Sequence, residues 1–178
     1  MINYFLLGQA IAFYKEVGYT YIEVPWIVSK EAQFATLSDE TRAFEVTDKG
    51  YLVGSAEQGI IELMKHGLSN GAYVSCSPCF RNEPVKDDLH LDQFMKVELS
   101  VISSELRNID DIVGHALMFK QARSPSMVKT KYISDTEIDL EINGVEVGSY
   151  GVREIDGKFL YYGTGLALPR FDQAVHMI

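Results

Sequence analysis

The sequence Cys79-Phe80-Arg81-Asn82-Glu83, followed after a charged loop by Gln93-Phe94, is the most informative part of the chain. An Arg-x-Glu pair on a strand offers a cation for a phosphate and a carboxylate for an exocyclic amine. Phe94 offers a flat apolar face for a purine, and Arg170, beside small residues, offers a second, cationic face for the same ring. Together these side chains predict a clamp for ATP.

Three segments of the chain resemble the signature motifs of the class II aminoacyl-tRNA synthetases. Residues 18–25 read GYTYIEVP and resemble motif 1, the segment around Arg81 resembles motif 2, and residues 163–170, GTGLALPR, resemble motif 3. Each motif alone occurs by chance in many sequences, whereas the ordered set covers nearly the whole chain. The chain is thus identified as similar to the catalytic core of this family.

The resemblance implies an α+β fold, with an antiparallel β-sheet flanked by helices, in a single domain over residues 1–178. It also implies a homodimer formed through residues 3–28, since motif 1 builds the dimer interface in the family. The alternative for that segment is an edge helix and strand of a monomer. A family member that charges tRNA normally adds an anticodon-binding domain, and 178 residues leave no room for one.

Composition favours a globular, cytoplasmic protein and disfavours a large nucleic-acid footprint. Hydrophobic residues make up 47% of the chain, yet no stretch approaches the roughly 20 apolar residues of a membrane span. The 16 Lys and Arg against 25 Asp and Glu give a net charge of −9, which opposes loose attraction to a polyanion. The charge balance leaves a local basic patch as an alternative. Its candidate residues, of which the last four lie in one segment, are Lys86, Arg107, Lys120, Arg123, Lys129 and Lys131.

The two cysteines, Cys76 and Cys79, form a lone Cys-x-x-Cys. Such a pair can carry redox chemistry or half a zinc site. Residues three apart on a strand point to opposite faces, and no second cysteine pair completes four zinc ligands. We therefore expect buried thiols without a catalytic role.

Periodicity and turn signals predict the order of secondary structure. Ser55 is a good N-cap for a helix with Ile60, Ile61 and Met64 on its buried side. Helices are expected over residues 3–17, from 55 onward, over 110–121 and from Gly165 to the end; strands are expected over residues 19–24, 44–46, 51–53, 72–80, 91–102, 137–142, 145–152 and 158–162.

The resemblance to motifs 2 and 3 assigns roles in an ATP site. It implies that Arg81 contacts the α-phosphate and the substrate carboxylate, Glu83 accepts from the adenine amine, and Phe94 and Arg170 hold the ring. Arg81 and Arg170 are the expected catalytic residues. The alternative for Arg81 and Glu83 is an ion pair along one strand face, because residues two apart share a face.

Glu146 and Ser149 are the expected ligands of Mg2+, since a carboxylate and a hydroxyl are hard oxygen donors suited to an ion that also bridges ATP phosphates. Upstream, Glu137, Asp139 and Glu141 form an acidic row on one strand face. Glu137 could help to hold the metal, or the row could be a solvated edge.

Three residues are expected to bind the amino acid: Glu57 and Glu98 at its ammonium group and Arg153 at its side chain. Residues 143–153, NGVEVGSYGVR, resemble the aspartyl and asparaginyl branch and the ammonia-dependent asparagine synthetase, where an Arg in this place faces the substrate side chain. The string QFMKVE at residues 93–98 resembles the seryl branch instead. Arg153 could otherwise pair with Glu154 or Asp156, and Glu57 could serve only the helix dipole.

These expectations combine into a ligase that activates a small amino acid with ATP to an aminoacyl-adenylate, using Mg2+. Aspartate or asparagine is favoured and serine comes next. The acceptor is open among ammonia, a carrier protein, a metabolite, a protein side chain and tRNA, and no membrane is involved. The alternative function is a non-catalytic paralogue that acts as a dimeric regulatory or nucleotide-binding protein.

Overall fold

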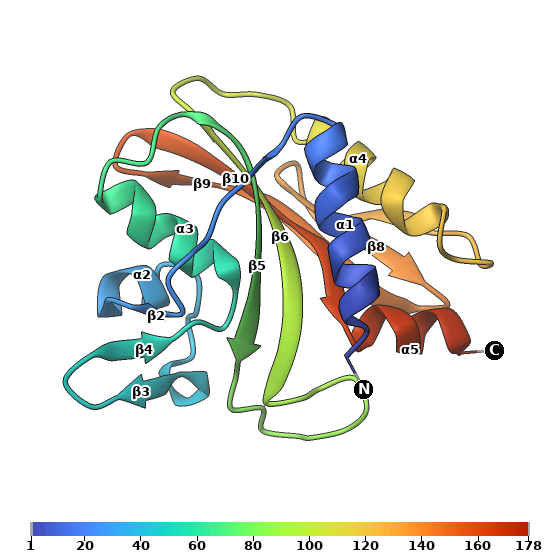
Figure 1. Cartoon of the computed structure of the whole chain (residues 1–178), viewed down its shortest axis with the longest axis horizontal. Coiled ribbons are helices and arrows are strands. Elements are labelled where there is room, and N and C mark those ends of the chain that lie inside the picture. The colour runs from blue at the N-terminus through green and yellow to red at the C-terminus, as the bar shows by residue number, and fades with distance from the viewer. Residues whose placement is uncertain (1, 178) are drawn as a thin grey trace.

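The computed structural model describes residues 2–177 and is built around one seven-stranded sheet (Figure 1). The strand pair at one edge of this sheet is parallel, and every other pairing in the sheet is antiparallel. The expected α+β fold is therefore confirmed. Across the sheet the strands follow the order β1 (Thr20–Tyr21), β5 (Gly71–Phe80), β6 (Gln93–Ser103), β10 (Lys158–Leu168), β9 (Val145–Ile155), β8 (Glu137–Ile142) and β7 (Lys129–Tyr132).

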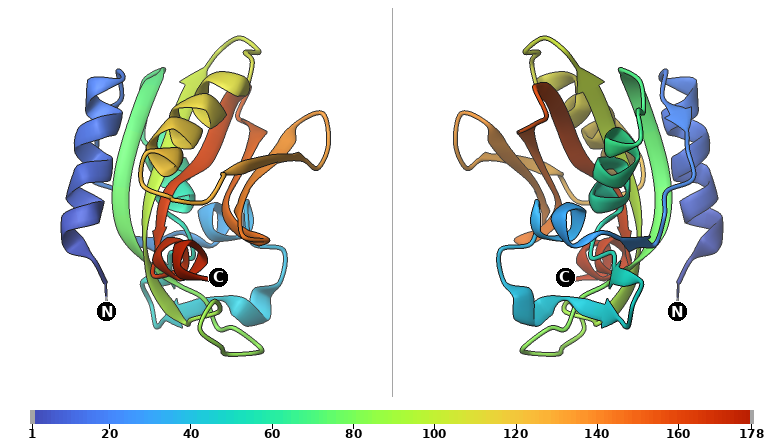
Figure 2. Two further views of the ribbon diagram at one scale, coloured as in Figure 1. Left: turned by 90° about the vertical axis from the view of Figure 1, so that its right-hand side faces the viewer. Right: turned by 90° about the vertical axis from the view of Figure 1, so that its left-hand side faces the viewer.

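Helices cover both faces of this sheet, with α1 and α3 on opposite sides of it (Figure 2). One face packs against α1 (Tyr4–Glu16), α4 (Asp110–Gln121) and α5 (Arg170–His176). The other face packs against α3 (Ala56–Lys65) and α2 (Lys30–Phe34). Beside α2 lies a small sheet of β2 (Ile27–Val28), β4 (Gly50–Leu52) and β3 (Phe44–Val46), preceded by a 3-10 turn at Glu40–Arg42.

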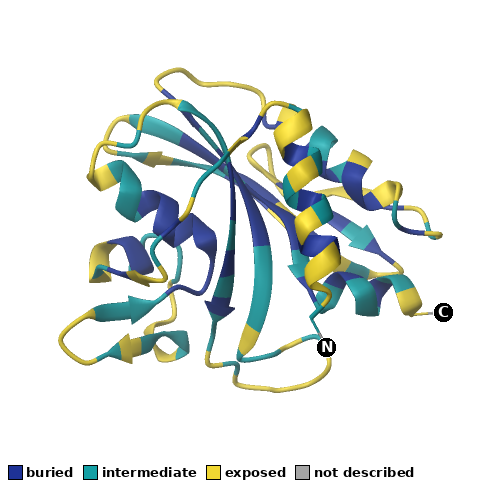
Figure 3. Cartoon of the chain, viewed as in Figure 1, coloured by how far each residue is buried: buried dark blue, intermediate teal, exposed yellow. Residues whose placement is uncertain are grey.

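The alternation of side chains along β6 separates two cores. Val97 and Leu99 belong to the larger core under α1 and α4, whereas Ile102 belongs to the smaller core under α3. Because successive strand residues point to opposite faces, the even-numbered positions of β6 all face the α3 side. Buried positions follow the central strands through the middle of the molecule (Figure 3). The α3 side of β6 is the face that carries the polar residues described below.

Several predicted elements are confirmed. The first helix occupies Tyr4–Glu16 and is followed by Gly18 at φ 104°, a left-handed conformation that glycine adopts without strain. The helix over residues 110–121 has the predicted limits. Ser55 caps α3 in a capping box with Gln58, which satisfies two otherwise free backbone N–H groups. No helix within residues 2–177 is long and apolar enough to cross a membrane.

The prediction of a final helix from Gly165 is wrong. Residues up to Leu168 continue β10, pairing with β6, and α5 begins only at Arg170. Pairing with a central strand overrides the helix-compatible composition of this segment. The sequence patterns also predict no element at α2, β2, β7 or the 3-10 turn, and the strand expected over residues 19–24 is reduced to Thr20–Tyr21.

Two expectations about polar side chains have different outcomes. Both cysteines are free; Cys79 is buried and Cys76 is half-buried, and burial raises the pKa of each thiol to about 11, which agrees with a packing role. Lys120, in contrast, does not belong to a surface basic patch, because its side chain is completely buried. Ile112 and Ala116 lie eight and four residues before it on the buried stripe of α4, so Lys120 falls on the same stripe.

Candidate active site

A cavity opens on the α3 side of the main sheet, between the loop that joins β5 to β6 and the start of α5. Strand parity places Phe94 and Lys96 on this side, because they share the face of Ile102. The cavity is lined by Arg81, Glu83, Leu89, His90, Leu91, Phe94, Lys96, Glu146, Val147, Ser149, Thr164, Ala167, Leu168, Pro169 and Arg170. All six residues expected at ATP are therefore brought together.

A bulge in β9 brings Glu146 and Ser149 to the same cavity. Residues three apart on a regular strand point to opposite faces. In β9 the pairing with β8 shifts between Glu141↔Glu146 and Leu140↔Gly148, so Val147 is an extra residue. The extra residue reverses the alternation, and both Glu146 and Ser149 are exposed and line the cavity.

Arg81 follows the end of β5 and is held by the backbone. Its Nε donates to the carbonyl oxygen of Gly54 at 2.8 Å, and its guanidinium carbon lies 5.3 Å from the centre of the Phe94 ring. Glu83 pairs with Arg42 rather than with Arg81, so the alternative of an Arg81–Glu83 ion pair is not formed. The terminal nitrogens of Arg81 remain available to a ligand at the cavity.

Arg170 closes the cavity from the other side. Its Nη2 donates to the carbonyl oxygen of Leu89 at 2.9 Å, and its Nη1 lies 3.9 Å from a carboxylate oxygen of Glu146. The loop between β5 and β6 is thereby tied to the first residue of α5. His90, in the same loop, lies 2.8 Å from Asp87 and is exposed.

The residues expected at the amino acid form a charge cluster behind Lys96, in which Glu57 and Glu98 are buried and Arg153 is half-buried. Arg153 Nε donates to Glu57 Oε1 at 2.8 Å, and the guanidinium lies 4.7 Å from the centre of the Tyr162 ring. Only 4% of Glu57 is exposed, and its burial raises the pKa of the carboxyl, an effect that Arg153 partly offsets. The partner of Arg153 is thus Glu57, and neither Glu154 nor Asp156 takes that place.

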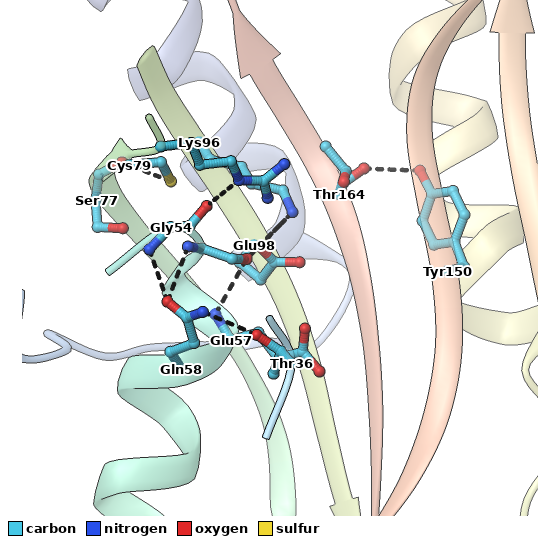
Figure 4. Close-up of polar contacts among 12 residues, drawn as sticks. Thr36, Gly54, Glu57, Gln58, Ser77, Cys79, Lys96, Glu98, Tyr150 and Thr164 are labelled. Carbon is cyan, nitrogen blue, oxygen red and sulfur yellow. Dashed lines mark hydrogen bonds and ion pairs between the residues drawn. The ribbon is translucent and has the colours of Figure 1, made fainter. Parts of the chain in front are cut away.

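Glu98 is the most deeply buried acid of this cluster, with 1% exposure. One of its oxygens, Oε2, accepts from Ser55 at 2.7 Å and lies 2.7 Å from the ammonium of Lys96 (Figure 4). The other oxygen, Oε1, has no hydrogen-bond partner among residues 2–177. A buried carboxylate oxygen without a partner is costly, so it marks a place for a donor from a ligand or from water.

Three buried hydroxyls share this property of Glu98. Ser75 pairs with Glu98 across β5 and β6, Ser77 pairs with Lys96, and Ser100 is the next even-numbered residue of β6. Within the described part of the chain the Oγ atoms of Ser75, Ser77 and Ser100 also lack partners. The face behind the cavity is therefore polar, buried and short of hydrogen-bond partners.

Comparisons with known proteins give the fold. Serine–tRNA ligase of Naegleria fowleri in complex with AMP matches with a TM-score of 0.75 and 21% identity, over 96% of this chain and 46% of that one. Seryl-tRNA synthetase of Pyrococcus horikoshii complexed with ATP gives a TM-score of 0.70 and 19% identity, over 96% and 49%. The chain has the catalytic-core fold of the class II aminoacyl-tRNA synthetases. A pyrrolysyl-tRNA synthetase of Desulfitobacterium hafniense shares this fold, with a TM-score of 0.68 and 16% identity over 94% and 66%.

One curated protein is similar to this chain in sequence. The serine–tRNA ligase of Aromatoleum aromaticum is 31% identical over 122 residues, which cover 57% of this chain and 29% of that protein. No protein-family model matches the chain. The chain therefore spans under a third of this curated relative and about half of the two seryl enzymes of known structure.

The expected metal site of the class II core can be tested by its donor set. Among residues 2–177 no group of three or more His, Cys, Asp or Glu side chains is arranged to hold a metal ion. Glu146 and Ser149 are two hard oxygen donors at an open cavity, which fits an ion that keeps several waters and phosphate oxygens as ligands. Of the upstream acids, Glu141 pairs with Lys131 at 2.9 Å. The donor set fits Mg2+ held jointly with a phosphate ligand.

Several residues of the site were missed from the sequence. Lys96 connects the cavity to the buried acids, and Thr164 lines the cavity from β10. Lys96 carries a usable signal, because it lies two residues after Phe94 and two before Glu98 on one strand face. The sequence gives no such signal for Arg42 and Thr164, because their positions at the site depend on contacts between distant segments.

Proposed function

We propose that this chain activates a small amino acid with ATP, forming an aminoacyl-adenylate and pyrophosphate. The observation that carries the proposal is a site with two parts: the cavity, which is its outer end, and the acidic cluster behind the lining residue Lys96, which is its inner end. Its outer end combines Arg81 and Arg170 with the aromatic face of Phe94. Its inner end leads through Lys96 to Glu98 and Glu57, two buried carboxylates suited to an ammonium group. We assign ATP to the outer end and the amino acid to the inner end.

In the proposed reaction, an oxygen of the substrate carboxylate attacks the α-phosphorus of ATP. A bond forms between that oxygen and phosphorus, the bond from phosphorus to the bridging oxygen breaks, and pyrophosphate leaves with the electron pair. Arg81 and Arg170 stabilise the charge that develops on the phosphate oxygens. Glu146 and Ser149 would hold Mg2+, which supplies further positive charge to the phosphates when bound. Positioning and electrostatics supply the rate enhancement.

For the substrate we propose serine or a similar neutral, polar amino acid before aspartate or asparagine. Arg153 already pairs through its Nε with Glu57 at 2.8 Å, so its charge is largely offset before an acidic substrate binds. A hydroxyl can instead donate to a carboxylate oxygen such as Glu98 Oε1, which lacks a partner among residues 2–177. The relatives named as serine–tRNA ligases support the same order.

The acceptor and the oligomeric state are further proposals. The acceptor is ammonia, a carrier protein, a small metabolite, a protein side chain or tRNA, and the net charge of −9 favours the first four. A homodimer through residues 3–28 is supported by apolar side chains that are exposed there: Tyr4 at 70%, Phe5 at 76% and Trp26 at 52%. Sedimentation of the wild type and of a Phe5→Glu variant tests the dimer.

Pyrophosphate exchange into ATP, measured with each of the twenty amino acids and Mg2+, tests the proposed reaction. Exchange with serine alone supports the whole proposal. Exchange with aspartate or asparagine keeps amino-acid activation and overturns the substrate order. No exchange with any amino acid, from protein that is folded, rejects activation and favours a non-catalytic paralogue; ATP binding by calorimetry then shows whether the nucleotide site is retained.

A further inference from the structure

Lys120 is a buried amine that the proposed reaction does not use. It lies on α4, on the face of the sheet opposite the cavity, and its side chain has 0% exposure. Its Nζ lies 2.6 Å from the carbonyl oxygen of Thr164, 2.8 Å from that of Gly165 and 2.9 Å from the hydroxyl of Tyr150. A lysine is almost never fully buried unless it is paired, so these three contacts require an explanation.

The contacts of Lys120 centre on a bulge in β10. Thr164 pairs with Glu98 of β6 and Leu166 pairs with Val97, so Gly165 is an extra residue without a partner in the ladder. Two phenols join the ammonium there: Tyr150 donates to the Thr164 carbonyl at 2.7 Å and Tyr14 to the Gly165 carbonyl at 2.9 Å. Figure 4 shows the contact between Tyr150 and Thr164. Side chains from α1, α4 and β9 thus satisfy the carbonyls at the bulge.

The bulge decides which residues of β10 reach the cavity. Before it, the even-numbered residues face the α3 side, as shown by Leu160 in the smaller core and Thr164 at the cavity. After it, Leu166 lies in the larger core and Ala167 lines the cavity, so the alternation is reversed. If β10 paired regularly through Gly165, Leu166 would face the cavity. Arg170 follows only three residues after Ala167.

We propose that Lys120 is a positioning residue that fixes the β10 bulge and thereby sets the wall of the nucleotide cavity from the opposite face of the sheet. The expected effect of Lys120 on catalysis rests on the proposed function. Its expected effect on the structure of β10 rests on the contacts alone. The hydrogen bonds of Lys120 go to the backbone carbonyls of Thr164 and Gly165 and to the hydroxyl of Tyr150, none of which is a lining side chain of the cavity. Its removal therefore changes the register of the wall without removing a group that contacts ATP.

Titratable groups on three other elements surround Lys120. Tyr14 on α1 and Tyr150 on β9 lie on its own side of the sheet, whereas Lys96 and Glu98 on β6 and Glu146 on β9 act on it electrostatically from the cavity side. Burial, with a smaller contribution from Lys96, lowers the pKa of Lys120 to about 7. Because the amine is easily neutralised, an apolar side chain of similar length is compatible with the fold, and Lys120→Met is a suitable test variant.

The test compares Lys120→Met with Ile112→Val, a core change on the same helix. For Lys120→Met we expect the KM for ATP to rise roughly tenfold with kcat within about threefold, since small displacements of a binding wall are costly. Amide hydrogen exchange in residues 163–168 is expected to accelerate, with residues 137–142 unchanged. Ile112→Val is expected to leave the KM and the exchange pattern of residues 163–168 as in the wild type.

A folded Lys120→Met protein with the wild-type KM for ATP and wild-type hydrogen exchange in residues 163–168 overturns the proposal. If Lys120→Met does not fold, Lys120→Gln, which keeps an N–H donor, is measured in the same way. If the wild type catalyses no pyrophosphate exchange, the proposed function fails, while hydrogen exchange at residues 163–168 still decides whether Lys120 holds the bulge.

Discussion

The two ends of the site differ in how their charges are arranged. At the outer end Arg81, Arg170 and Glu146 are half-buried or exposed, and each arginine is anchored to a backbone carbonyl. At the inner end Glu57 and Glu98 are 4% and 1% exposed and are already paired with cations. The outer end therefore offers donors at an open cavity, whereas the inner end combines paired buried charges with polar atoms that lack partners among residues 2–177.

This difference matches the tasks proposed for the two ends. Phosphates of ATP arrive with their own charge and leave as pyrophosphate, so accessible cations are suitable there. An amino acid is distinguished by a few hydrogen bonds in a buried place, where an unpaired group is costly and selectivity is high. Substitutions at the outer end should thus affect rate, and substitutions at the inner end should affect stability and substrate choice.

The largest effect is expected for Arg81→Ala. Loss of a cation at the developing charge should lower pyrophosphate exchange by roughly a hundredfold or more, with little change in stability because the side chain contacts one backbone carbonyl and one ring. Arg107→Ala is the matched control, since Arg107 contacts Ser103 away from the cavity. Equal activity of the two variants would contradict the role of Arg81.

At the inner end Arg153→Leu should mainly reduce stability. It leaves Glu57 buried without its cation, at a cost of about 2 kcal/mol in the free energy of unfolding at neutral pH. Because burial raises the pKa of Glu57 in the folded state, the variant should gain stability as pH falls from about 7 to 5, where the folded state binds the proton more tightly.

Urea unfolding of Arg153→Leu at several pH values measures this effect. The double variant Glu57→Gln/Arg153→Leu is the control, since it carries no buried charge at this position. It should be more stable than the single variant at pH 7 and lack its pH dependence. If single and double variants lose the same stability at every pH, the Glu57–Arg153 pair does not act as described.

The sequence predicts those parts of the fold that depend on local signals. The capping box at Ser55 and the spacing around Gly18 are such signals, and so are motifs 2 and 3 and the segment 143–153, which carry the six expected residues of the cavity. The bulges at Val147 and Gly165 arise from strand pairing, so no local pattern shows them. The Glu57–Arg153 contact joins residues 96 positions apart, so no local sequence pattern predicts it either.

A smaller effect that separates the two ends is expected for Ser55→Ala. Ser55 caps α3 and donates to Glu98, so its loss should cost about 1 kcal/mol and raise the KM for the amino acid roughly fivefold. Ser29→Ala removes the cap of α2 and a hydrogen bond to Glu62, away from the cavity. Thermal unfolding should detect both changes; a KM increase in the Ser29 variant would argue against a local effect of Ser55.

The smallest effect is expected for Cys76→Ser, since Cys76 packs on the face of β5 away from both ends. The rate of pyrophosphate exchange into ATP should stay within about twofold of the wild type. Burial raises the thiol pKa to about 11, so alkylation by iodoacetamide at pH 8 should be roughly a hundredfold slower than for an ordinary thiol. Rapid alkylation that abolishes activity would place Cys76 in the reaction.

A crystal structure with a sulfamoyl analogue of seryl-adenylate tests the division of the site most directly. We predict that adenine lies between Phe94 and Arg170, and that the seryl group lies at the inner end, where its hydroxyl donates to Glu98 Oε1, the carboxylate oxygen without a partner among residues 2–177. An analogue bound with its adenine at the inner end, or bound outside this cavity, would contradict the account.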